Sequence, residues 1–82
     1  MHIVYILRSL KVPHRTYIGY TTDLQQRLYE HNHSAHGHTK QFAPWEPETY
    51  VVFKDEQLAK KFETYLKSGS GHAFFRKRLV AS

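Results

Sequence analysis

The first residues of the chain alternate in a way that makes both faces of a strand apolar. Over residues 2–8, the two faces are Ile3, Tyr5 and Leu7 and, opposite them, Val4 and Ile6. This pattern is typical of a central strand that is covered on both sides. Residues 15–20 are rich in β-forming side chains and predict a second strand after a turn at residues 11–14. The short connection predicts an antiparallel hairpin.

The spacing of apolar residues then becomes helical. Thr22, followed three residues later by Gln25, is a capping-box pattern, and it predicts a helix over residues 23–32. Two leucines identify the inward face of that helix, which consists of Leu24, Arg27, Leu28 and His31. Residues 33–47 predict a long polar loop, because they combine three histidines, one glycine and two prolines. Residues 49–53 predict a third strand.

The last third of the chain predicts two more helices. Asp55 is placed to cap a helix that reaches residue 67, with an inward stripe of Leu58, Phe62, Tyr65 and Leu66. We expect Gly69 to end this helix in the left-handed conformation and Ser70 to cap a short final helix. Phe75 and Leu79 would be the inward pair of that final helix.

The predicted order is therefore β-β-α-β-α-α. This order indicates the α+β class, with a small three-stranded, mainly antiparallel sheet flanked by helices. A chain of 82 residues is expected to form one domain, spanning residues 1–82.

Composition narrows the function. The chain has no cysteine, which excludes a disulfide framework and a thiol nucleophile. No apolar run approaches the roughly 20 residues that cross a bilayer, so we expect a cytoplasmic protein without a membrane partner. The net charge of +5 favours an anionic partner, with nucleic acid as the first candidate. The alternative is a basic protein with no particular ligand.

Several polar residues lie where a plain core would not need them. Gly19 shares a strand face with Tyr17 and would leave a notch beside it, although ordinary sheet tyrosines explain the same pattern. Arg27 lies on an inward helix face, so it needs a wet cleft or an anionic partner, unless it extends to the surface along its stem. Glu63 lies at the edge of an apolar stripe, where a salt bridge with Lys60 or Lys67 is the simplest interpretation.

Two further groups of charged residues have simple alternatives. The four neighbouring histidines at positions 31, 33, 36 and 38 could form a zinc site, but exposed or phosphate-facing side chains fit their close spacing better. The tail from Lys67 through Arg76 has no acidic residue and predicts a contact with a DNA backbone. A basic helix face in solvent is the alternative.

Five of these positions together resemble the GIY-YIG endonuclease family. Residues 17–19, Tyr-Ile-Gly, match its second signature, and residues 3–5 look like a degenerate first signature that keeps Tyr5. Arg27 follows Tyr17 by ten residues, His31 follows Arg27 by four, and Glu63 lies on a later helix, as in the family. The resemblance covers nearly the whole chain, and it is closest to small stand-alone bacterial members and to the nuclease domain of the excision-repair endonuclease.

The resemblance implies a DNA endonuclease that uses Mg²⁺ or Mn²⁺. Glu63 would bind the metal, Arg27 would clamp the scissile phosphate, Tyr5 or Tyr17 would take a proton from water, and His31 would assist. The implied substrate contacts are Gly19, Lys40, Lys67 and Arg76. Cleavage would follow DNA shape or a weak sequence preference, in repair or recombination. RNA as substrate, a homodimer and a protein partner stay open, and a non-catalytic nucleic-acid-binding module is the alternative function.

Two departures from the family pattern stand out. Ile3 replaces the glycine of the first signature. No asparagine follows Glu63, where some members use one, so that supporting role is vacant or is taken by His72 or Arg76.

Overall fold

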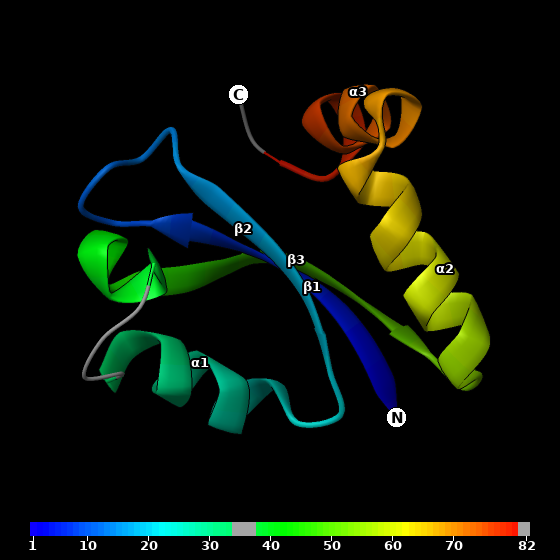
Figure 1. Cartoon of the computed structure of the whole chain (residues 1–82), viewed down its shortest axis with the longest axis horizontal. Coiled ribbons are helices and arrows are strands. Elements are labelled where there is room, and N and C mark those ends of the chain that lie inside the picture. Colours follow the sequence, from blue (N-terminus) through cyan, green and yellow to red (C-terminus); the bar gives the residue numbers. More distant parts are fainter. Residues whose placement is uncertain (34–37, 81–82) are drawn as a thin grey trace.

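The fold is a three-stranded antiparallel sheet with helices on both faces (Figure 1). A computed structural model describes residues 1–33 and 38–80. Its elements, in chain order, are β1 (His2–Ser9), β2 (Thr16–Thr21), α1 (Leu24–His33), the 3-10 helix η1 (His38–Phe42), β3 (Trp45–Phe53), α2 (Glu56–Lys67) and α3 (Gly69–Arg78). This order confirms the predicted β-β-α-β-α-α arrangement and the α+β class, and it adds η1 within the predicted loop.

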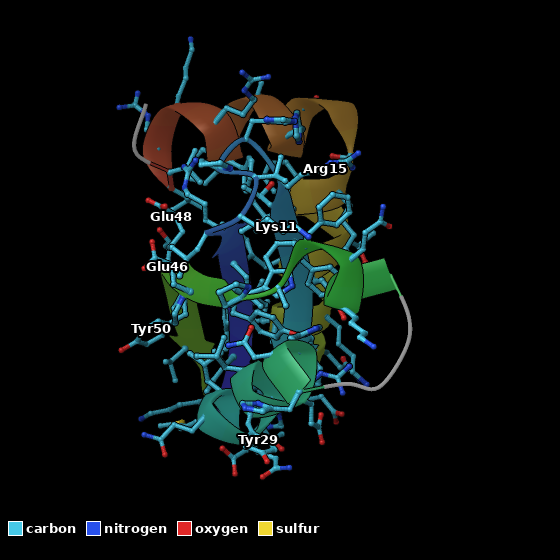
Figure 2. The ribbon with its side chains drawn as sticks, turned by 90° about the vertical axis from the view of Figure 1, so that its left-hand side faces the viewer. Lys11, Arg15, Tyr29, Glu46, Glu48 and Tyr50 are labelled. Carbon is cyan, nitrogen blue, oxygen red and sulfur yellow. The ribbon has the colours of Figure 1, made fainter. Side chains whose placement is uncertain are left out.

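The strand order is β2-β1-β3, so β1 is the central strand, as its apolar faces predict. Tyr5 lies opposite Gly19 on one side and opposite Tyr50 on the other. β3 begins at Trp45, four residues before the predicted start at residue 49. The prediction missed this part because it carries proline and glutamate, which are tolerated on an edge strand but not in a sheet interior. Figure 2 shows Glu46, Glu48 and Tyr50 following one another along this edge.

The two faces of the sheet bury separate cores. Alternation along β1 sends Tyr5 and Leu7 towards α1, where they pack with Trp45. The residues between them point to the other face, where α2 and α3 complete a core of Val4, Ile6, Ala59, Leu66 and Phe75. Sequence positions one residue apart on β1 therefore belong to different environments, and only the face under α1 carries the tyrosines.

The start of α1 differs from the predicted capping box. Asp23 rather than Thr22 caps the helix, because its Oδ1 accepts a hydrogen bond from the backbone N–H of Gln26 at 3.1 Å. Leu24 and Leu28 pack against the core, as predicted.

The inward face of α2 was only partly predicted. Asp55 caps the helix and accepts from the backbone N–H of Leu58. Ala59 and Leu66 are buried, but Leu58 is 56% and Tyr65 43% exposed, so the prediction that these two face the core is wrong. A stripe of this width fixes the rotation of a helix only within about one residue on either side, and packing on the sheet turns α2 towards Ala59.

The junction between α2 and α3 also differs from the prediction. Ser68 is extended, with φ −81° and ψ 168°, and it both ends α2 and caps α3 by accepting from the backbone N–H of Gly71. The predictions of a left-handed Gly69 and of a cap at Ser70 are therefore wrong, because one extended serine makes the whole turn. The predicted inward pair on α3 is confirmed: Phe75 is buried and Leu79 packs against it in the same core.

None of the helices in the described part of the chain has the length and apolar character needed to cross a membrane.

Candidate active site

The phenol of Tyr5 lies directly over Gly19. The two residues are cross-strand partners in β1 and β2, and Tyr5 is 1% exposed. A Cβ atom added to Gly19 would lie 3.0 Å from Cε1 of Tyr5 and closer still to its Cζ and hydroxyl oxygen. The notch predicted beside Tyr17 therefore exists, but the ring of Tyr5 fills it. Gly19 is required because it lets this ring cross the neighbouring strand.

His31 contacts the hydroxyl group of Tyr5. Its Nε2 lies 3.0 Å from that oxygen, and its ring packs against Tyr17 with centroids 4.7 Å apart. Burial lowers the pKa of His31, and the positive charge of Arg27 lowers it further against the opposing effect of Glu30. The imidazole is therefore neutral at neutral pH, where it can either donate to the phenol or accept from it.

Burial raises the pKa of Tyr5, while hydrogen bonding and the positive charge of Arg27 lower it. Burial has the larger effect, so the phenol is protonated in the free protein. Added positive charge, from a cation or from a rearranged Arg27, would favour the phenolate.

Arg27 lies at the mouth of the site rather than inside it. Its side chain is 46% exposed, and Nη1 donates to Oε1 of Glu30 at 3.1 Å. Its interaction with Tyr5 is the largest contribution that raises its pKa. Both sequence interpretations of Arg27 thus hold in part, since it extends towards solvent and also contacts the site. The partner Glu30 was missed, although its i,i+3 spacing is a recognisable signal.

Glu63 approaches from the other side of the sheet. It lies on α2, and its Oε2 accepts from Nζ of Lys67 at 3.1 Å, the salt bridge that the sequence offered as the simplest interpretation. The carboxylate is nevertheless only 23% exposed, and its negative charge contributes to raising the pKa of Tyr5. Glu63 and Tyr5 therefore share one electrostatic environment, although the effect is the smallest of those on Tyr5.

A hard divalent cation fits the donors at this position. Mg²⁺ and Mn²⁺ prefer oxygen ligands and are often held by one or two carboxylates, with water and phosphate completing the shell. Glu63 supplies such a carboxylate, partly shielded from solvent and beside a cluster that contains a phenol. Within the described residues, no three side chains of His, Asp or Glu gather in one place.

The walls of the site include two residues that the sequence did not single out for it. The ring of Trp45 lies 6.3 Å from that of Tyr17. Asn32 holds Trp45 at both backbone groups: its Oδ1 accepts from the Trp45 N–H at 2.6 Å, and its Nδ2 donates to the Trp45 carbonyl at 3.2 Å. This pair of bonds fixes the end of α1 against β3. No spacing rule could have linked two residues on different elements.

The remaining predicted residues lie outside the tyrosine cluster. Lys67 is exposed beside Glu63, Lys40 is exposed on η1, and Arg76 lines a separate cavity next to α3. His33 stacks on Tyr29, on the outer side of α1, where Figure 2 labels that tyrosine. His36 and the side chain of His38 fall outside the part that the structure describes.

The chain was compared with known proteins. A search of curated proteins found no match. A model of the GIY-YIG catalytic domain matches residues 1–77, which takes in both tyrosines, Arg27, His31 and Glu63. Because this match spans nearly the whole sequence, the chain belongs to the GIY-YIG catalytic domain family and has a nuclease-type fold.

Proposed function

We propose that this chain is a divalent-metal-dependent endonuclease that hydrolyses DNA phosphodiester bonds. The observation that carries the proposal is the contact of Tyr5 with both His31 and Arg27, with the carboxylate of Glu63 acting on the same phenol. We further propose that cleavage follows DNA shape or a weak sequence preference, and that it serves DNA repair or recombination.

Arg27 would bind the scissile phosphate. Its planar guanidinium matches two phosphate oxygens at once, and it lies beside Tyr5. Its ion pair with Glu30 is exposed on both sides and so contributes only about 0.5 kcal/mol. A phosphate group can displace Glu30 at little cost, and the guanidinium then lies between the substrate and the phenol.

Tyr5 and His31 would move the proton. As water attacks phosphorus, one of its protons passes to the oxygen of Tyr5 while the phenol proton passes to Nε2 of His31. The leaving deoxyribose oxygen takes a proton from solvent. The lowered pKa of His31 keeps Nε2 able to accept at neutral pH, and the 3.0 Å separation already suits the transfer. Tyr17, packed on His31, would position the phosphate or the water.

Glu63 would hold the cation, as the donor chemistry indicates. When bound, Mg²⁺ or Mn²⁺ supplies Lewis-acid stabilisation of the phosphate oxygens and positive charge near the phenol. The ion pair of Glu63 with Lys67 joins two neighbours on one helix, so Lys67 can turn away without any change in the fold.

The test is cleavage of labelled single-stranded, duplex and branched DNA in Mg²⁺, Mn²⁺ or EDTA, with Glu63→Gln and Glu56→Gln compared. Glu56 is a matched control, because it forms the same i,i+4 pair at 3.1 Å, with Lys60, on the same helix. We expect metal-dependent cutting that Glu63→Gln slows at least about 100-fold, while Glu56→Gln cuts like the parent.

Equal cutting by the two variants would overturn the role of Glu63. A folded parent that binds DNA but cuts nothing with either metal would favour the non-catalytic nucleic-acid-binding module instead.

A further inference from the structure

A second basic site lies away from the tyrosines, between the β1–β2 turn and α3. A cavity of about 450 Å³ opens there, in the size range of small-ligand pockets. Phe75 forms part of its apolar floor, and its polar lining comes from both sides of the gap: Arg8, His14, Thr16, His72 and Arg76. In Figure 1 the turn and α3 lie at the same end of the molecule.

The polar lining carries positive charge and a hydroxyl group but no carboxylate. Arg8 is held in the wall, because its Nε donates to Glu48 at 2.6 Å and its Nη1 donates to the carbonyl of Pro13. Arg76, by contrast, is exposed on a helix that contains no acidic residue, and within residues 1–33 and 38–80 no carboxylate forms a salt bridge with it. Arg76 is therefore the charge in this cavity that is available to an added anion.

The cavity stands at a fixed position relative to the candidate active site. Arg8 and Thr16 are cross-strand partners three residues further along β1 and β2 than Tyr5 and Gly19. Three residues of strand span about 10 Å, which corresponds to roughly three base pairs of duplex DNA. An odd offset places the cavity on the opposite face of the sheet, but β2 is an edge strand, so both places border the same edge.

We infer that this cavity binds a backbone phosphate of the bound nucleic acid, about three base pairs from the phosphate at Tyr5. Arg76 provides the charge, and Thr16, His14 and His72 provide hydrogen-bonding groups around it. The strand would follow the β2 edge, with one phosphate on each side of it. The inference rests on the proposed function for the identity of the ligand, and it adds a second anchoring site that sets the direction of the strand.

The test measures duplex binding by fluorescence anisotropy in EDTA, where nothing is cut, over a range of salt concentrations. Arg76→Gln is compared with Arg78→Gln, which removes the same charge from the same helix but does not line the cavity. We expect Arg76→Gln to weaken binding about tenfold and to lower the slope of log Kd against log salt by about 0.9. We expect Arg78→Gln to leave both within about twofold of the parent.

Equal losses in the two variants would show diffuse attraction rather than a site, and no loss in Arg76→Gln would show an empty cavity; either overturns the inference. The ring signals of His72 in NMR spectra give a second readout, with duplex and inorganic phosphate titrated separately. A shift with inorganic phosphate but not with duplex would assign the cavity to a free anion and also overturn it. If Arg76 is needed for binding but the parent cuts no DNA with either metal, the nuclease proposal fails and the phosphate site stands.

Discussion

Replacing Gly19 with alanine tests the central geometric claim, that the glycine exists to admit the ring of Tyr5. The added Cβ would lie 3.0 Å from Cε1 of that ring and would overlap the phenol tip. Carbon atoms in contact prefer about 3.5–4.0 Å, so the ring must shift by at least about 0.5 Å. It has little room to do so, because Tyr5 is 1% exposed and hydrogen bonded to His31.

The expected cost follows from two opposing effects. Overpacking of a core costs about 1–3 kcal/mol, whereas removing a glycine from a strand returns about 0.5–1 kcal/mol. Gly19→Ala should therefore lower the free energy of unfolding by about 1–2 kcal/mol. For a chain of 82 residues this corresponds to a melting temperature lower by roughly 10 °C. Cleavage should also fall, because the displaced phenol loses its position beside His31.

Urea unfolding followed by the fluorescence of Trp45, the single tryptophan and a buried one, measures this cost. Gly69→Ala is the matched control, since an added Cβ there meets nothing within 4 Å. That control should keep or slightly raise the stability. In a Tyr5→Leu background the penalty of Gly19→Ala should disappear, which gives a coupling energy of about 1 kcal/mol or more. If Gly19→Ala is as harmless as Gly69→Ala, or if its penalty survives in the Tyr5→Leu background, the reasoning is wrong.

Three other changes have expected outcomes that follow from the structure. The folded-state pKa of His31 is lowered, so its neutral form stabilises the protein fully above the unfolded value of about 6.5, and this contribution is lost as the pH falls through the folded pKa; the difference in unfolding free energy between the parent and His31→Gln should therefore shrink from about pH 7 to pH 5, and a constant difference would contradict it. Asp55→Ala removes the cap that accepts from the Leu58 N–H and should cost about 1 kcal/mol in urea unfolding, whereas Asp55→Asn should restore most of it. Gly71→Ala would drive a Cβ into the backbone carbonyl of Tyr65, which cannot move aside as a side chain can, so it should cost about 3 kcal/mol or more; near-parental stability would show that α2 and α3 are not packed this closely.

The class of fold and the family follow from the order of residues alone. Two apolar faces on residues 2–8 were enough to make this the central strand, because only a strand covered on both sides needs both. The order of Tyr17, Gly19, Arg27 and His31 along a strand and a helix was enough to indicate the GIY-YIG family, which the match over residues 1–77 confirms. The catalytic roles of these residues stay predictions.

Which of these side chains meet depends on how the elements pack together. Periodicity assigns a residue to a face of its own element, but not to a neighbour on another element. It could not show that Tyr5 rather than a ligand fills the space over Gly19, nor that His31 contacts that phenol. It also could not separate Arg76, which lines the second cavity, from the other basic residues of α3.

The rotation of a helix has the same origin. Leu58 and Tyr65 fit an inward stripe as well as Ala59 and Leu66 do, yet only the latter pair is buried. A helix settles where its closest packing on the sheet is, and here the small side chain of Ala59 permits the closest approach. That choice turns the helix so that Glu63 lies partly buried within electrostatic reach of Tyr5, a relation that depends on the packing of α2 against the sheet and that no stretch of sequence contains.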